Sequence, residues 1–244
     1  MNDQADPITI ALRIPARWSS PRDLIQRLPE GYRVTPETLI LPDETQVEFA
    51  PMPADDQFAQ IFRSSCREPA TEEELEVVAG YTVNAILSGA GGSLQSAHRM
   101  MRAGAALVRA GGAGVFIDNC ALAHGGGNWL AMTDDGSSDA LSFAYVNIVR
   151  GKTEVWTMGM HVLGLRDLVM KRQDIEKGFD IVDVIRYVAG SEKPVGHGHL
   201  LADLSGPRFQ TFAQDSDPSL AGSPMHNPFG RFKLVSMRDI AETN

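Results

Sequence analysis

The stretch from Asp118 to Asn128 holds residue types that could do chemistry. Cys120 and His124 are the thiol and imidazole that a cysteine-dependent enzyme uses as nucleophile and base. Asp118 is the expected group to orient the imidazole, with Asn119 as an alternative, and Asn119 and Asn128 are candidate ligand-binding amides. Four residues of separation do not place two side chains together. The same pattern therefore also fits a buried cysteine beside polar residues that bond loop amides.

A glycine-rich segment at residues 124–127 matches the oxyanion loop of some lipases and esterases. The matching nucleophile motif is incomplete, since the nearest approach, residues 91–95, lacks its final glycine. Two phosphate-binding motifs also fail. Residues 89–94 end in leucine where a dinucleotide loop has its third glycine, and residues 151–153 lack the upstream glycine of a P-loop. These motifs predict turns.

Two histidines are spaced like metal ligands. His197 and His199 alternate, so on an extended chain both imidazoles would project to one side. Asp203 is the expected third metal ligand, with His161 as the alternative, and His161 is also a candidate ligand-binding residue. A metal site needs three or four converging groups, and two histidines between glycines also fit a polar loop. The sequence leaves any cofactor unidentified.

Charge and composition narrow the class of protein. The chain has 244 residues, with 22 Lys and Arg against 31 Asp and Glu, for a net charge of −9. That balance argues against partners with a phosphate backbone and against anionic membrane surfaces. Two cysteines are too few for a disulfide framework. With an acidic N-terminus and no apolar run of about 18 residues, the sequence predicts a soluble, cytoplasmic protein of bacterial type.

The periodicity of the first 70 residues predicts a small β-α-β-β unit. Ser20 and Pro21 are typical of a helix start. A polar segment with a proline at residues 67–71 marks a predicted boundary between units 1–70 and 71–244. The expected elements of the first unit are a strand at 8–14, the helix after Ser20, strands at 38–41 and 46–50, and a short helix at 55–63.

The larger unit is predicted to hold a mixed sheet covered by helices, so the fold class is α+β. A strand at 77–87, a helix from Ser93 to the glycines at 111–112, and a strand at 114–118 favour a parallel neighbouring pair. The remaining expected elements are helices at 138–149 and 174–189 and strands at 153–160, 208–214 and 231–237. On the 153–160 strand, Trp156, Met158 and Met160 are expected to face the core.

Several motifs carry a resemblance to a known family. Residues 155–160 and 163–167, the segment 227–232, and the region 111–129 with its His-Gly stretch resemble an uncharacterised bacterial family, domain of unknown function family 4261. The domain would cover roughly the last third of the chain, and the similarity thins before residue 77. The resemblance implies no activity, cofactor or catalytic residue.

These observations favour a noncatalytic binding or accessory module with an unidentified small-molecule or protein partner. The alternative is a hydrolase-like enzyme that is metal-dependent through His197 and His199, or cysteine-dependent through Cys120 and His124. A structural subunit of a larger assembly is a third hypothesis. It would show an exposed apolar patch.

Overall fold

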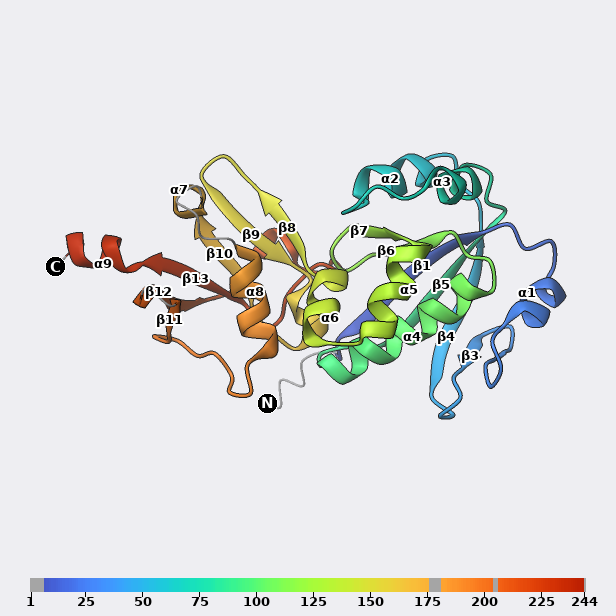
Figure 1. Cartoon of the computed structure of the whole chain (residues 1–244), viewed down its shortest axis with the longest axis horizontal. Helices are drawn as coiled ribbons and strands as arrows, with labels where there is room; N and C mark the ends of the chain where they lie inside the picture. The colour runs from blue at the N-terminus through green and yellow to red at the C-terminus, as the bar shows by residue number, and fades with distance from the viewer. Residues whose placement is uncertain (1–6, 176–180, 204–205, 244) are drawn as a thin grey trace.

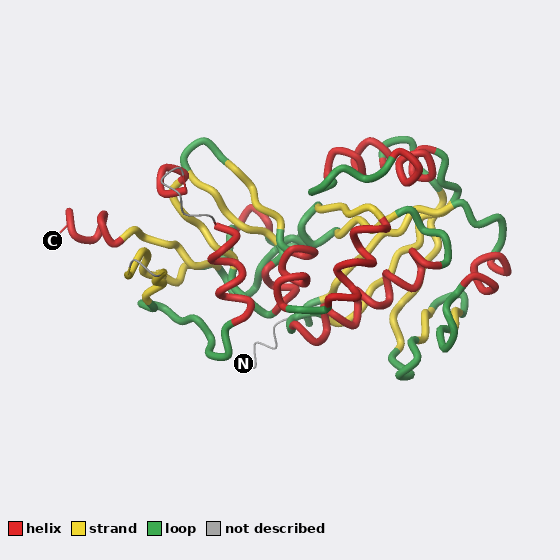
Figure 2. Tube along the Cα trace, in the orientation of Figure 1, coloured by secondary structure: helices red, strands yellow, loops and turns green. Residues whose placement is uncertain are grey.

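The computed structural model describes residues 7–175, 181–203 and 206–243 of the chain. It has the predicted α+β class. Its strands form two sheets that lie side by side along the long axis, with helices packed against them (Figures 1 and 2). Among the described residues, no helix is long and apolar enough to cross a membrane.

The first sheet has seven strands in the order β2-β3-β4-β5-β1-β6-β7, all paired antiparallel. Their bounds are β1 (Thr9–Ala16), β2 (Arg33–Val34), β3 (Thr38–Ile40), β4 (Gln46–Pro53), β5 (Val83–Ala90), β6 (Gly114–Ile117) and β7 (Leu122–Gly125). β1 is an inner strand whose alternate residues Ile10, Leu12 and Ile14 are fully buried. This alternation is the period-2 pattern that predicted the strand.

The helix between β5 and β6 is α4 (Leu94–Arg109), and Ser93 accepts a capping hydrogen bond at its start, as predicted. β5 and β6 run in the same direction, because both are antiparallel to β1. The prediction that they are neighbours was wrong, because β1 lies between them. The result is a split β-α-β unit, in which an earlier strand fills the place beside β5.

The predicted strand at 77–87 was wrong in its first half. Thr71 and Glu74 form a capping box that begins helix α3 (Glu72–Ala79), and this helix carries Val78 into a small core. β5 begins only at Val83. The local capping interaction outweighs the β-branched composition of this segment. The other helices before β5 are α1 (Pro21–Arg27), capped by Ser20 as predicted, and α2 (Phe58–Ser65).

The predicted boundary at residue 70 falls inside the first sheet. β4, before that position, pairs with β5, after it, from Glu48↔Ser88 to Pro53↔Val83. The main hydrophobic core also continues across the boundary and into the second sheet, from Ile10 to Leu234. Residues 1–70 therefore share both their sheet and their core with the rest of the chain.

The second sheet has six strands in the order β11-β12-β13-β10-β9-β8. Their bounds are β8 (Asn147–Arg150), β9 (Glu154–Met158), β10 (Asp167–Lys171), β11 (Leu200–Asp203), β12 (Gly206–Gln214) and β13 (Arg231–Ser236). β10 and β13 pair in parallel and the other neighbours are antiparallel, so this sheet is mixed. The strands expected at 77–87 and 114–118 of the same predicted unit lie in the first sheet instead. One face packs against α8 (Ile181–Gly190), whose buried residues belong to the same core.

Helix α6 (Ser138–Tyr145) is shorter than its predicted range 138–149, since β8 begins at Asn147 and its β-branched residues continue as strand. The predicted helix 174–189 is seen as the end of α7 (Arg172–Ile175) and as α8, and positions 176–180 of that prediction lie outside the described residues. The remaining elements are α5 (Gly126–Asp135), the 3-10 turns η1 (Met160–Leu163) and η2 (Pro218–Leu220), and α9 (Met237–Thr243).

Candidate ligand-binding site

The Cys120 thiol lies in the turn between β6 and β7 and is completely buried. Burial raises its pKa to about 12, so at neutral pH the sulfur keeps its proton. The nucleophile in a cysteine enzyme is the thiolate. Cys120 therefore has the properties of a small core residue.

The His124 imidazole, on β7, lies between the rings of Trp129 and Phe143, at centroid distances of 5.9 and 6.1 Å. Its Nε2 donates to the carbonyl of Ala144 over 2.9 Å. Burial lowers the pKa of His124 to about 4. Nδ1 is buried without a hydrogen-bond partner in the described part of the chain, so the ring is neutral at physiological pH.

The other residues of the 118–128 cluster have separate partners. Asp118 accepts from Arg13 Nε of β1 over 2.7 Å, and Asn128 donates to Glu68 over 3.1 Å. The Cys120 thiol bonds the backbone of Leu122 and the His124 imidazole bonds the carbonyl of Ala144, so within the described residues no hydrogen bond joins these two side chains. The structure thus does not assemble Asp118, Cys120 and His124 into one hydrogen-bonded set.

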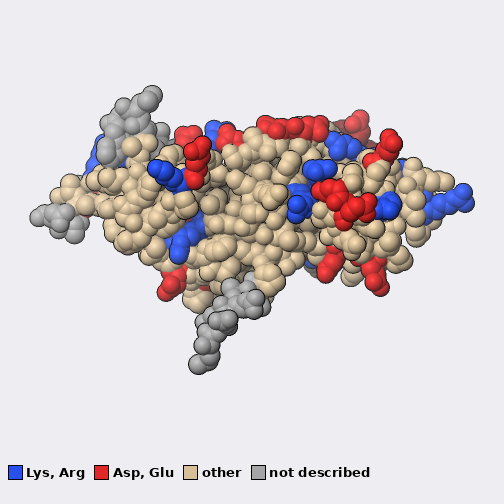
Figure 3. Space-filling view, turned by 90° about the horizontal axis from the view of Figure 1, so that it is seen from below, with Lys and Arg blue, Asp and Glu red and all other residues tan. Residues whose placement is uncertain are grey.

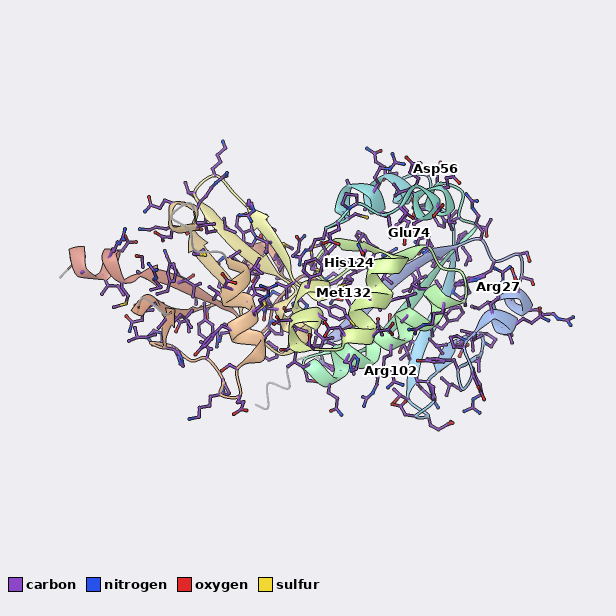
Figure 4. All side chains as sticks on the ribbon, viewed as in Figure 1. Arg27, Asp56, Glu74, Arg102, His124 and Met132 are labelled. Carbon is purple, nitrogen blue, oxygen red and sulfur yellow. The ribbon has the colours of Figure 1, made fainter. Side chains whose placement is uncertain are left out.

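The glycine-rich segment after His124 forms the start of α5. The amide of Gly127 donates to Glu74 Oε1 over 2.8 Å, and the amide of Gly126 donates to the carbonyl of Ala113. Glu74 reaches this segment from α3, above α5 and near His124 (Figure 4). A carboxylate of the protein itself therefore accepts the hydrogen bond of an amide that an oxyanion would need.

Asn119 and His161 are two predicted ligand-binding residues that the fold does bring together. Asn119 Nδ2 lies 3.4 Å from His161 Nε2, and both groups donate to the carbonyl of Pro224. Asn119 also bonds β1, at the amide of Ala11 and the carbonyl of Thr9. Burial lowers the pKa of His161 to about 4. These side chains hold the loop between β12 and β13 against the body of the protein.

The predicted metal ligands lie near β12. His197 Nδ1 accepts from the amide of Ala213 over 3.2 Å, and His199 Nε2 lies 3.5 Å from the hydroxyl of Tyr187. The side chain of Asp203 lies outside the described residues. Across the residues that are described, no group of three or more His, Cys, Asp or Glu side chains has an arrangement that could hold a metal ion.

A pocket that the sequence did not predict lies on the face of the second sheet away from α8. We call it the outer-sheet pocket. Its volume is about 250 Å³, and its lining comes from β9, β10, the start of β13 and the loop before β13. The residues that define it are Trp156, Met158, Asp167, Asp217, Asn227 and Arg231.

The side chains of β9 form part of the floor of the outer-sheet pocket, although Trp156 and Met158 were expected to face the core. Val155 and Thr157 are the fully buried residues of this strand, whereas Trp156 and Met158 are only half-buried. Val169 of β10 is paired with Trp156 and also lines the pocket. Met160, which lies in η1 beyond the end of β9, is buried in the core as expected. For Trp156 and Met158 the expectation was wrong, because the smaller residues of the strand face the layer containing α8.

Asp167 anchors one end of the outer-sheet pocket. Its Oδ1 accepts from Thr157 Oγ1 over 3.1 Å and from the amide of Met160 over 3.3 Å. Its Oδ2 accepts from Asn227 Nδ2 over 2.9 Å. Burial outweighs these hydrogen bonds and raises the pKa of Asp167 to about 6.

Arg231 brings a positive charge to the same pocket. Its Nη1 lies 4.0 Å from Asp217 Oδ2, and its Nε is buried without a hydrogen-bond partner in the described part of the chain. Arg231 is the first residue of β13 and stands opposite Asp167 in the parallel register. With Glu154 at the edge, three carboxylates and one guanidinium line the cavity.

The loop wall of the outer-sheet pocket is fixed in place. Asn227 donates to the carbonyl of Leu165 as well as to Asp167, and the Ser216 hydroxyl donates to the carbonyl of Asn227. Gly230 has φ +80°, and a Cβ there would lie 2.4 Å from the carbonyl oxygen of Gln214. Residue types alone did not place Asp167 beside this turn.

Comparison of the chain with protein-family models, with curated proteins and with solved structures gives no match. The resemblance to domain of unknown function family 4261 therefore stays a prediction.

Proposed function

We propose that the protein is a noncatalytic binding module whose ligand occupies the outer-sheet pocket. The observation that carries this proposal is the convergence of Trp156, Asp167, Asp217 and Arg231 on one cavity of about 250 Å³. Apolar surface with a few placed polar groups is typical of small-molecule sites. Because Asp167 and Asn227 already fix the loop wall, little ordering entropy would be lost on binding.

The state of the candidate catalytic groups also supports binding over catalysis. The Cys120 thiol is buried and protonated, burial lowers the pKa of His124 to about 4 and so makes the ring a weak base, and Glu74 fills the glycine-rich amide site. Asp167 has a raised pKa in a cavity, which is a feature of many active sites. Its two oxygens, however, accept hydrogen bonds from three groups of the protein, and this gives the carboxylate a structural role.

The hydrolase hypothesis has less support. Its cysteine form needs a thiolate at Cys120, which burial opposes. Its metal form needs a third ligand beside His197 and His199, and these two rings face different partners. The face drawn in Figure 3 carries acidic and basic side chains interspersed rather than a wholly basic region, which favours a small-molecule ligand over a nucleic acid.

The experiment uses the three tryptophans as reporters at three places. Trp156 lines the outer-sheet pocket, Trp18 lines an apolar groove beside α1, and Trp129 is fully buried. The intact protein is labelled with 5-fluorotryptophan, and each fluorine resonance is assigned with a Trp→Phe variant. A library of charged and neutral fragments is then added. We expect fragments that shift the Trp156 resonance and leave that of Trp129 unchanged.

The two other patterns would overturn the proposal. Fragments that shift only the Trp18 resonance would move the site to the groove beside α1. No shift at any tryptophan would remove the small-molecule hypothesis. The Trp156→Phe variant identifies the Trp156 resonance. Thermal melting of each labelled sample shows whether a sample that does not respond to the fragments is folded.

A further inference from the structure

The charged side chains that line the outer-sheet pocket are mostly negative and only loosely paired. Three carboxylates, Glu154, Asp167 and Asp217, share the cavity with one guanidinium, Arg231. Arg231 and Asp217 form an ion pair with a long separation of 4.0 Å between Nη1 and Oδ2. Negative charge is therefore in excess, and it favours a cationic group on the ligand.

The guanidinium of Arg231 adds a separate requirement. Within the described residues its Nε has no hydrogen-bond partner although the atom is buried. The side chain as a whole is 37% exposed, so its terminal nitrogens are open to an acceptor on a ligand. The planar guanidinium of an arginine can donate two parallel N–H hydrogen bonds to a carboxylate, so a carboxylate is the acceptor that suits it best.

The apolar part of the pocket has its own preference. Trp156 and Met158 of β9 and Val169 of β10 provide an aromatic and aliphatic floor between the charged groups. A tryptophan face stabilises a nearby ammonium group and also packs against an aliphatic or aromatic body. The cavity volume of about 250 Å³ limits the ligand to a small molecule.

We propose that the ligand is a small zwitterion of the amino-acid type, whose carboxylate meets Arg231, whose ammonium meets the loop carboxylate of Asp217, and whose apolar body lies on Trp156. This inference rests on the proposed function, because it names the ligand class of the same site. It assigns a specificity to the two ionic residues. Arg231 selects the anionic end and Asp217 selects the cationic end.

The test uses three probes that share a phenylethyl body and differ in the charged groups attached to it: phenylalanine, phenethylamine and 3-phenylpropionate. The readout is the Trp156 fluorine shift on titration, which gives a dissociation constant for each probe. We expect phenylalanine to bind about tenfold more tightly than either singly charged probe, as one buried charged hydrogen bond commonly contributes. Phenethylamine should bind more tightly than 3-phenylpropionate, because negative charge is in excess.

Two variants separate recognition from a general effect on folding. Asp217→Asn should weaken phenylalanine and phenethylamine about tenfold and leave 3-phenylpropionate unchanged or tighter. Arg231→Gln should weaken phenylalanine and 3-phenylpropionate by a similar factor and leave phenethylamine unchanged or tighter. The matched controls are Arg109→Gln and Asp134→Asn. Each removes an ion pair between α4 and α5, whose residues do not line the outer-sheet pocket.

The outcomes divide clearly. A crossed pattern, in which each variant weakens only the probes that carry the opposite charge, supports the inference. If 3-phenylpropionate or phenethylamine binds as tightly as phenylalanine, or if both variants weaken all three probes equally, the zwitterion assignment is wrong. If other fragments shift Trp156 but none of these three probes does, the binding module stands and only its ligand class is overturned.

Discussion

Protonation of His124 should destabilise the fold as the pH falls. The ring is buried between Trp129 and Phe143, Nε2 donates to Ala144, and Nδ1 has no acceptor in the described part of the chain. A second proton would place an unpaired charge in the core. Burial accordingly lowers the pKa of His124 from 6.5 to about 4.

The size of the effect follows from these two pKa values. Between about pH 6.5 and about pH 4 the unfolded chain binds more protons at this position than the folded chain, so the free energy of unfolding rises with pH across this window. From about pH 7.5 to about pH 4.5 the His124 contribution should fall by about 2.5 kcal/mol. His161, with a pKa also lowered to about 4, acts in the same direction.

The assay is urea unfolding of the parent and of His124→Gln at both pH values, followed by tryptophan fluorescence. Glutamine does not titrate and keeps a donor near the position of Nε2, so the variant should lose about 2.5 kcal/mol less than the parent on acidification. His98→Gln, on α4, is the control for loss of a histidine elsewhere. An unchanged loss in His124→Gln would refute the argument that this ring is held neutral by burial.

Further predictions concern four other residues. When the pH is raised from about 4.5 to about 7.5 in the same assay, the free energy of unfolding of the parent should fall by about 2 kcal/mol more than that of Asp167→Asn. The reason is that the raised pKa makes ionised Asp167 unfavourable in the folded state. Glu74→Gln should lower the unfolding free energy by about 1 kcal/mol through two helix N-termini, and a change within error would refute this role. Gly159→Ala should cost about 2 kcal/mol or more in urea unfolding, since φ is +101° and the new Cβ would lie 2.2 Å from a carbonyl oxygen. Iodoacetamide followed by mass spectrometry should leave Cys120 unmodified until the chain is unfolded, and modification in the native state would contradict its burial.

The fold was predicted best where local pattern and tertiary structure agree. The alternation of apolar residues in β1 and the caps at Ser20 and Ser93 gave correct elements. The pattern failed at Val77 and Val78, because β-branched residues also pack well on a helix that a capping box has started. It also gave the wrong neighbour for β5, because a strand from an earlier part of the chain fills that place.

The outer-sheet pocket could not be predicted from residue types. The chemically suggestive cluster at 118–128 drew attention to Cys120 and His124, but burial opposes the thiolate form of Cys120 and makes His124 a weak base. The pocket instead depends on Asp167 and Arg231, which are 64 residues apart and meet only through the parallel register of β10 and β13. Charged residues at strand starts are common, and nothing local distinguishes these two.

The position of β1 has a consequence for how the chain folds. Leu12 pairs with Ile117, and Thr9 pairs with Ala90, so an early strand finds both of its neighbours in much later parts of the sequence. Closing loops of this length costs entropy before the pairing is gained, and such non-local pairing slows folding. During synthesis on a ribosome, β1 would have to wait for β5 and then for β6 before the first sheet was complete. We therefore expect this sheet to form late and cooperatively, with the apolar side chains of β1 exposed to aggregation until the strands on both sides are in place.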